Sequence, residues 1–357
     1  MPAGRVRRSV GRLAAVIVLV GGLSIGGCLW LRPSPVAIPV VPEGGYGFGV
    51  GAPQSWMSDA DADRELDAVA RTRASWMRVL IDWHIVEPVK GQYNWHYVDH
   101  WVNGSTKRGL KVLGLIAYTP DWARAPGSYF SAPPVNPADY ADFVSAVVQR
   151  YRDRVADWEI WNEPNSVLAW TSGPQGPEPA VYAEMLKASY PKIKAADRGA
   201  VVIGGVVTAV VSFFALTMDP VTFVQKMYAA GAGGSFDALS FHPYHYNLKF
   251  SAGAGVPNSP LSQADGIHQA MAANGDGGKK LWATEYGEPN SAVDEATQAD
   301  YIRDFLAKWR TLPYAGPSYV YTTRDRVTGS SNPEESIGVY RSDWSPKPAQ
   351  AAVKSMT

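Results

Sequence analysis

The sequence of 357 residues has little cysteine and no excess of charge of either sign. Its one cysteine, Cys28, excludes an intrachain disulfide and a zinc site built from cysteines. The 33 basic residues are balanced by 33 acidic residues. Proteins that bind nucleic acids normally carry a basic excess, so we predict no nucleic-acid partner.

A second absence concerns nucleotide cofactors. No Gly-x-Gly-x-x-Gly turn follows the first expected strand, so nothing supports a dinucleotide-binding sheet. We therefore expect that the protein works without a cofactor and without a metal ion.

Aromatic residues, by contrast, are abundant, with 13 Trp and 18 Tyr. Their rings have flat apolar faces and, in Trp and Tyr, a polar edge, which suits sugars and other amphipathic ligands. We expect more than half of these rings to lie in the core and the rest to be available for binding.

The N-terminus has the pattern of an export signal. Arg5, Arg7, Arg8 and Arg12 precede Leu13–Leu31, a stretch without any charge. Two alternatives remain open here. The stretch is just long enough to span a bilayer as an uncleaved anchor. Alternatively, Ile25-Gly26-Gly27-Cys28 resembles a bacterial lipobox, which would make Cys28 the lipidated first residue of the mature protein.

These features predict three segments. Residues 1–31 form a signal peptide or a lipoprotein or membrane anchor, residues 32–45 form a proline-rich linker, and residues 46–357 form one large domain. We accordingly predict an exported monomer that is tethered to the cell membrane through its N-terminus. The domain of residues 46–357 would lie outside the cytoplasm.

The domain from residue 46 onward contains eight short β-rich runs, each followed by a helical pattern. Helices are expected over 180–196 and 297–310, and helix starts at Asn136-Pro137 and Ser345-Pro346. Such alternation predicts an α/β fold, a single (β/α)₈ TIM barrel. The expected strands are Tyr46–Val50, Trp76–Asp82, Lys111–Ala117, Ala156–Trp161, Ala200–Gly205, Phe236–Phe241, Lys280–Glu285 and Pro317–Tyr321.

Two glutamates stand at the ends of expected strands. Glu163 lies in Asn162-Glu163-Pro164-Asn165 after the fourth strand, and Glu285 ends the seventh. The carboxyl ends of barrel strands surround one mouth, so the two carboxylates are expected to meet there. Paired carboxylates flanking a bond are what glycoside hydrolysis requires.

These motifs carry a family resemblance. Trp158-Glu159-Ile160-Trp161-Asn162-Glu163-Pro164-Asn165 and Thr284-Glu285-Tyr286-Gly287 resemble the clan A retaining glycoside hydrolases. Within the clan, the sequence is most similar to the family 39 β-xylosidases and to bacterial exopolysaccharide endoglycosidases. The resemblance extends over Arg78–Trp83, Val86–Trp95 and Gly114–Trp122, and so covers roughly Tyr46 to the C-terminus.

The resemblance implies roles for individual residues. Glu163 would be the acid/base and Glu285 the nucleophile, and the charge of Glu285 is expected to raise the pKa of Glu163. Asn162 would bind the sugar 2-hydroxyl. Arg78 would keep Glu285 ionised, and a final pair of residues would orient it, namely His242 and Tyr244.

Aromatic residues near the strand ends are candidates for contacts with the sugar. Tyr118, Trp122 and Trp170 follow the third and fourth strands and are predicted sugar platforms, whereas Trp161 is expected to pack in the core. Many clan members have a Trp at the end of the eighth strand, which is absent here. Tyr321 or Trp344 would take its place.

The predicted function is retaining hydrolysis of O-glycosyl bonds in a β-linked oligosaccharide or polysaccharide, and we expect this saccharide to belong to the cell envelope or to the surroundings of the cell. Two alternatives stay open. One is a non-catalytic carbohydrate-binding envelope protein on the same barrel. The other is a metal-dependent hydrolase that uses His242, His245 and Glu285 as ligands.

Overall fold

The structure is a computed structural model and describes residues 45–51 and 53–356. The predicted export signal, the lipidation of Cys28 and the proline-rich linker up to residue 44 lie outside the described residues. Among the helices of the described part, none is long and apolar enough to cross a membrane.

Eight parallel strands form a closed barrel in which each strand pairs with its neighbour in sequence. The barrel closes where β1 pairs with β8, and Gly47 of β1 lies opposite Tyr319 on one side and Trp76 on the other. The predicted fold is therefore confirmed. The strands are β1 (Tyr46–Gly49), β2 (Trp76–Asp82), β3 (Lys111–Ala117), β4 (Asp157–Ile160), β5 (Val201–Thr208), β6 (Ala238–His242), β7 (Leu281–Tyr286) and β8 (Ala315–Tyr321).

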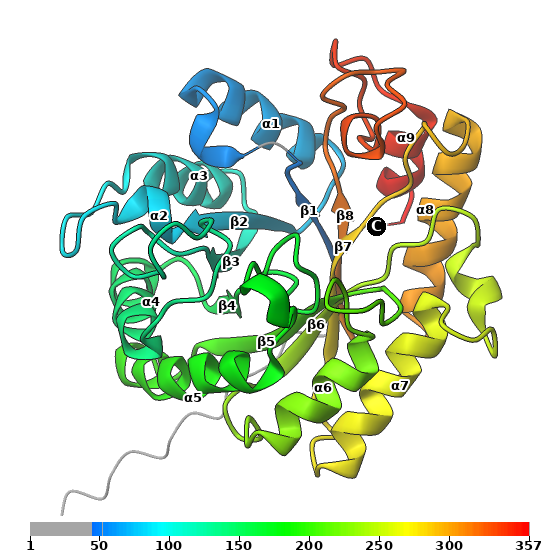
Figure 1. Cartoon of the computed structure of the whole chain (residues 1–357). Helices are drawn as coiled ribbons and strands as arrows, with labels where there is room; N and C mark the ends of the chain where they lie inside the picture. Colours follow the sequence, from blue (N-terminus) through cyan, green and yellow to red (C-terminus); the bar gives the residue numbers. More distant parts are fainter. Residues whose placement is uncertain (1–44, 52, 357) are drawn as a thin grey trace, which may run out of the picture. The chain divides into compact units, whose positions relative to one another are not determined.

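Helices surround the barrel in chain order, as Figure 1 shows in a view along its axis. Short 3₁₀ helices lie in four loops: η1 (Gln54–Trp56), η2 (Gly173–Gln175), η3 (Phe250–Gly253) and η4 (Pro333–Glu335). The α-helices are α1 (Asp59–Arg71), α2 (Trp83–Val86), α3 (His96–Lys107), α4 (Pro137–Tyr151), α5 (Pro179–Ala196), α6 (Pro220–Ala229), α7 (Pro260–Ala273), α8 (Glu295–Trp309) and α9 (Pro348–Lys354).

Helix starts follow from local capping. Asn136 caps α4 by accepting a hydrogen bond from the amide of Ala138, as its sequence predicts. The start predicted at Ser345-Pro346 is wrong, because α9 begins at Pro348. The amide and hydroxyl of Ser345 both donate to Asp343 instead, and Pro346 pairs with Tyr340 in an antiparallel bridge. These bonds keep the segment extended for two more residues.

The barrel interior is filled by large side chains. Trp76, Trp282 and Tyr319 form an aromatic group there, together with smaller apolar residues of β3, β5 and β6. Gly47 makes room for it, since a Cβ at this position would lie 2.6 Å from both Trp76 and Tyr319. The interior is thus a packed core, and a ligand can bind only at its ends.

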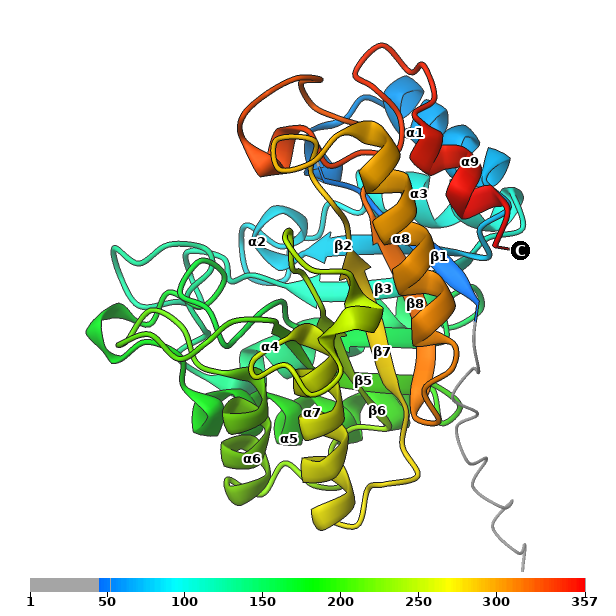
Figure 2. The same cartoon turned by 90° about the vertical axis from the view of Figure 1, so that its right-hand side faces the viewer.

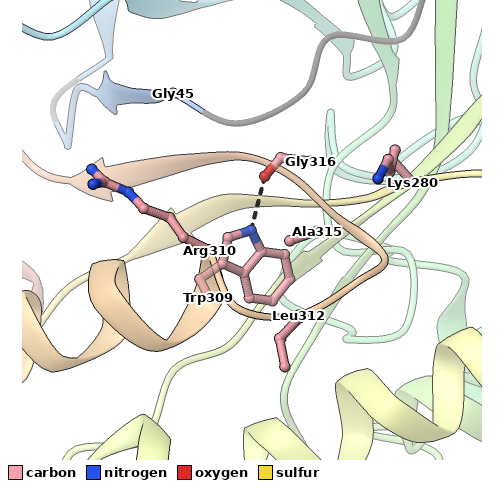
Figure 3. Close-up of a pocket in the computed structure, with 7 residues that line it drawn as sticks. All are labelled: Gly45, Lys280, Trp309, Arg310, Leu312, Ala315 and Gly316. Carbon is pink, nitrogen blue, oxygen red and sulfur yellow. Dashed lines mark hydrogen bonds between the residues drawn. The ribbon is translucent and has the colours of Figure 1, made fainter. Parts of the chain in front are cut away.

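One pocket opens at the amino ends of the last strands (Figure 3). Lys280 precedes β7, Ala315 and Gly316 begin β8, and Trp309 donates through Nε1 to the carbonyl of Gly316 at 2.9 Å. The glutamates of the predicted site lie at the opposite ends of the strands, so this pocket is not part of that site. Its remaining lining residues are Gly45, Arg310 and Leu312.

Asp157, the first residue of β4, is a buried carboxylate with few interactions that would stabilise its charge. Its side chain is 6% exposed, and its Oδ1 has no hydrogen-bond partner. Burial raises the pKa of Asp157 to about 7, and the charge of Lys111 offsets only part of that effect. The folded protein therefore holds a proton that the unfolded chain releases near pH 4, and stability falls between about pH 4 and 7.

We predict that Asp157→Asn removes this pH dependence. The stability gained over the unchanged protein should be small at pH 4 and grow to a few kcal/mol at pH 8 (on the order of 1–4 kcal/mol). Denaturant unfolding at pH 4, 6 and 8 measures it. Asp121→Asn, at a side chain that is 87% exposed, is the control. A difference between Asp157→Asn and the unchanged protein that does not vary with pH would contradict the prediction.

Candidate active site

The two predicted catalytic glutamates meet at the carboxyl ends of the strands. Glu163 follows β4, Glu285 lies in β7, and His242 ends β6 between them. The Nδ1 atom of His242 is 2.8 Å from Glu163 Oε1 and 3.6 Å from Glu285 Oε2. One oxygen of each glutamate and one ring nitrogen of His242 all lie within 4.8 Å of one another.

The backbone around Glu163 is held in unusual conformations. Positive φ angles occur at Tyr118 (71°), Trp161 (71°), Glu163 (43°) and Val206 (45°). The amide of Glu163 donates to the carbonyl of Val206 at 2.9 Å, where β5 has an irregular register against β6. Strained residues of this kind persist where the surrounding structure fixes them, and they gather at functional sites. The strain turns the Glu163 carboxylate into the mouth of the barrel.

Both oxygens of Glu285 accept hydrogen bonds. Tyr244 donates its hydroxyl to Oε2 at 2.8 Å, and Arg78 donates through Nη1 to Oε1 in an ion pair. A second nitrogen of Arg78, Nη2, donates to Asn162 Oδ1 at 3.0 Å. The structure thus brings the predicted residues Arg78, Asn162 and Tyr244 together around Glu285. Their contacts fix the orientation of its carboxylate.

Glu159, a residue that sequence reasoning missed, binds Arg78 on the side away from Glu285. Glu159 in β4 accepts a hydrogen bond from Arg78 Nε at 2.6 Å, and the two side chains are 0% and 6% exposed. Burial lowers the pKa of Arg78, but the charges of Glu159 and Glu285 raise it by more, so the guanidinium stays charged. The signal was present in the sequence, since a Glu within an otherwise buried strand requires a partner of opposite charge.

The pKa of Glu163 differs from the expectation. Burial raises it, but the hydrogen bond and the charge of His242 lower it by more, with further lowering from Thr208 and Arg78. The net shift is downward. The prediction that Glu285 would raise the pKa of Glu163 is therefore wrong for the free site, because the imidazole of His242 lies closer to Glu163 than to Glu285.

His242 is fully buried, and both of its ring nitrogens have partners. Nδ1 contacts Glu163, and Nε2 lies 3.0 Å from the hydroxyl of Thr284, the residue before the predicted nucleophile. The Thr284 hydroxyl can donate or accept, so it suits either protonation state of the imidazole. His242 can therefore exchange a proton with Glu163 without moving.

A third carboxylate at the mouth was also missed. Glu334, in η4 after β8, accepts a hydrogen bond from the Tyr321 hydroxyl at 3.2 Å. Burial raises the pKa of Glu334, and the charges of Glu285 and Glu163 raise it further. Glu334 lies in a long polar loop, and no sequence signal distinguishes it from a solvated carboxylate.

The prediction that Trp170 is a sugar platform is wrong. Its side chain is fully buried, and its ring packs 5.5 Å from Trp161 and 6.1 Å from Tyr182. The ring thus packs between Trp161, which follows β4, and Tyr182 of α5. Trp161 is buried as well, which confirms its predicted packing role.

The other predicted aromatic residues remain candidates. Tyr118 and Trp122 are half-buried, and Trp122 donates through Nε1 to the carbonyl of Glu87 at 2.9 Å. Tyr321 ends β8, and its ring lies 6.3 Å from that of Tyr244. Trp344 instead lies beside two arginines, Arg64 and Arg324, at 4.7 and 4.6 Å. Tyr321 is thus the better placed of the two alternatives for the missing Trp.

The metal site considered from the sequence is not formed as expected. In the described part of the chain, the one group able to hold a metal ion consists of Glu163, His242 and Glu285. His245 is not a member, and its Nδ1 accepts a hydrogen bond from the amide of Asn247 at 3.3 Å. Arg78 already donates to Glu285, so a cation there would face a second positive charge.

We predict that Trp170→Ala destabilises the fold rather than one sugar subsite. Loss of a fully buried indole costs about 3–5 kcal/mol. Hydrolysis of a polymer and of an aryl monoglycoside should fall by the same factor, measured beside thermal unfolding. Trp122→Ala is the comparison, because this half-buried ring should affect the polymer more. A polymer-selective loss in Trp170→Ala with unchanged unfolding would contradict the prediction.

Comparison with known proteins places this geometry among glycoside hydrolases. The family model described as cellulase (glycosyl hydrolase family 5) matches residues 42–316. The chain is also 28% identical over 85 residues to endo-1,4-beta-xylanase 1 of Gibberella zeae, a stretch that covers 23% of each protein. The clan resemblance inferred from the strand-end motifs is confirmed.

Solved structures share the barrel. A family 39 glycoside hydrolase from Bacteroides cellulosilyticus has a TM-score of 0.70 at 23% identity, over 87% of this chain and 62% of that one. A monomeric beta-xylosidase from Caulobacter crescentus has a TM-score of 0.65 at 18% identity, over 88% and 69% of the two chains. The chain thus spans less than two thirds of the first of these structures and of the xylanase. At such identities the likeness establishes the fold alone.

Proposed function

Because the chain belongs to the cellulase family, glycosyl hydrolase family 5, we propose that it cleaves β-linked glycosides with retention of configuration at the anomeric carbon. Glu285 is the nucleophile and Glu163 is the general acid and base. The observation that carries the proposal is the close approach of the two carboxylates.

The separation of the carboxylates distinguishes the two types of glycosidase. Retaining enzymes hold them about 5–5.5 Å apart, and inverting enzymes roughly 6.5–9.5 Å apart, to leave room for a water molecule. Here, oxygens of Glu163 and Glu285 lie within 4.8 Å of each other. This short approach supports direct attack by one carboxylate on the sugar.

The reaction then proceeds in two displacements. Glu285 attacks the anomeric carbon while Glu163 gives its proton to the leaving oxygen, and a glycosyl–enzyme ester forms. Glu163, now ionised, takes a proton from a water molecule that attacks the ester, and Glu285 is released. Tyr244 and Arg78 support the first step by holding both oxygens of Glu285 in place.

The low pKa of Glu163 requires a source for its proton. His242 Nδ1 lies 2.8 Å from Glu163 Oε1, so the pair can share one proton. In the open site the hydrogen bond and the charge of His242 hold the pKa of Glu163 below its ordinary value. A bound sugar that displaces water makes the charged carboxylate of Glu163 more costly, and so it favours the protonated form of this residue. Substrate binding thus favours the acid form of Glu163 that the first step requires.

The remaining residues define a sugar site around the pair. Asn162 is within reach of the reacting sugar and is oriented by Arg78, which supports the proposed contact of Asn162 with the 2-hydroxyl. Tyr321 forms the floor and Tyr118 and Trp122 provide half-buried rings on the loop after β3. We propose a β-linked oligosaccharide or polysaccharide of the cell envelope or its surroundings as substrate, bound by a monomer.

The mechanism predicts different losses for the two glutamates. Glu285→Gln should abolish glycosyl–enzyme formation. Glu163→Ala should still cleave aryl glycosides with good leaving groups in the first step but release the sugar slowly, and azide should restore turnover as a β-glycosyl azide. Proton NMR of the first product reads the stereochemistry, with Asp121→Ala as a control for surface substitution. An inverted first product would exclude these assignments.

The metal-dependent alternative makes a separate prediction. Chelator treatment should leave hydrolysis of an aryl β-glycoside unchanged, since the proposed reaction needs only the two carboxylates and His242. Loss of activity with a chelator, restored by a divalent cation, would favour a metal-dependent hydrolase. The non-catalytic alternative predicts saccharide binding without turnover in the same assay.

We also propose that the protein is exported and tethered through residues 1–31. The protein should fractionate with membranes, and a protein beginning at Glu43 should be soluble and active. Metabolic labelling with a fatty acid should mark Cys28, and Cys28→Ser should abolish the label. A protein that stays membrane-bound without any label would instead carry an uncleaved anchor.

A further inference from the structure

An exposed apolar surface lies beside the proposed acid/base. Its five members belong to the loops after β4 and β5, which Figure 2 shows in green, projecting at the left beyond the strands. Their side chains are between 49% and 89% exposed, whereas large apolar residues normally cluster in this way only at interaction sites. We call them the apolar hairpin patch: Leu168, Val211, Phe213, Phe214 and Leu216.

This surface is firmly connected to the proposed acid/base. Asn165, two residues after Glu163, donates through Nδ2 to the carbonyls of Thr208 and Met218 at 2.9 Å each. Its Oδ1 accepts from the amide of Thr208 at 2.9 Å. One side chain therefore ties both ends of the 208–218 loop to the segment that carries Glu163. The amide of Val167 adds a bond to the carbonyl of Leu216 at 2.9 Å.

The tip of the loop is a closed, strained turn. The amide of Phe213 donates to the carbonyl of Thr217 at 3.0 Å, and Phe214 has a φ of 47°, which is unusual for a bulky residue. The ring of Phe214 is nonetheless 89% exposed. Below it, Gly176 lies against Ala215 so closely that a Cβ would be 2.1 Å from its carbonyl oxygen. The backbone of this turn is thus strained, and it holds an apolar ring in solvent.

The loop has few polar groups to offer a sugar. No charged residue occurs between Ala200 and Met218. Ser212 accepts from the amide of Asp219 at 2.9 Å, and Thr217 donates to the carbonyl of Val211 at 2.7 Å, so both hydroxyls are engaged within the loop. Sugar sites place hydrogen-bonding groups beside aromatic rings. The five side chains of the apolar hairpin patch offer none, and they suit a hydrocarbon chain.

The position of the apolar hairpin patch indicates which part of a bound substrate would contact it. Glu163 gives its proton to the leaving oxygen, so the leaving group lies beside the loop after β4. Leu168 comes five residues later in the same loop. We propose that the leaving group of the substrate carries a hydrocarbon chain, so that the substrate is a glycolipid whose chain lies on the apolar hairpin patch. This inference rests on the proposed function.

Kinetics with methyl, butyl and octyl β-glycosides test it, using the sugar whose 4-nitrophenyl glycoside the full-length protein cleaves fastest. All substrates are kept below their critical micelle concentrations. We expect kcat/KM to rise with chain length, by up to about fourfold for each methylene that becomes buried. In the triple variant Leu168→Ser, Phe213→Ser, Phe214→Ser, the octyl-to-methyl ratio should fall close to one.

The control is Val256→Ser, an exposed apolar position on the loop after β6. It should keep the octyl-to-methyl ratio of the unchanged protein, and thermal unfolding checks that each variant is folded. An unchanged ratio in the triple variant would overturn the inference. So would three other results: preference for a β-linked polymer that the triple variant loses, binding to phosphatidylcholine vesicles without any chain-length effect, and self-association that the triple variant abolishes.

A binding measurement separates failure of this inference from failure of the proposed function. If no glycoside is cleaved, the proposed function fails, and calorimetric titration with octyl β-glucoside and methyl β-glucoside decides the role of the surface. Octyl glucoside binding that the triple variant weakens at least about tenfold, with a negative heat-capacity change, would support a hydrocarbon site. Equal binding of octyl glucoside by the unchanged protein and the triple variant would reject it.

Discussion

The site depends on one buried cation. Arg78 lies between Glu159 beneath it and Glu285 above it, and a third donor reaches Asn162. A buried arginine without partners would be costly, and either carboxylate would be costly without the arginine. Together they form a network that fixes the side chain of the proposed nucleophile from the floor of the barrel mouth. Because the guanidinium is planar and has donors on three nitrogens, it orients each partner in a definite direction.

The two proposed catalytic carboxylates have partners of different kinds. Glu285 is held by donors with fixed positions, Arg78 and Tyr244, and is suited to attack. Glu163 has a partner that can exchange a proton, His242, and is suited to transfer one. Both carboxylates lie in similar surroundings at the ends of strands. The different roles proposed for them follow from the chemistry of the partner, a guanidinium in one case and an imidazole in the other.

Much of this could be predicted from the sequence. Strand spacing predicted the barrel, and the order of parallel strands then required residues at strand ends, such as Glu163 and Glu285, to converge. Glu159 could have been found by the same reasoning. The errors concern loops. Trp170 was placed at the mouth because it follows β4, but whether a loop residue points outward or inward depends on packing between distant segments. Glu334 reaches Tyr321 through a long loop, and no local pattern indicates that contact.

The prediction of the pKa of Glu163 was wrong for another reason. The same reason links the site to the apolar hairpin patch beside it. Sequence order gave the two carboxylates but not the distance of each from His242, and that distance decides which charge dominates. The bonds that set it belong to a short segment: the strained turn at Glu163 aims the carboxylate, and Asn165 two residues later ties down the 208–218 loop. Movement of the loop tip and reorientation of the acid therefore involve the same backbone. The hydrogen bonds of Asn165 that hold the apolar hairpin patch in place therefore also hold the segment that carries Glu163.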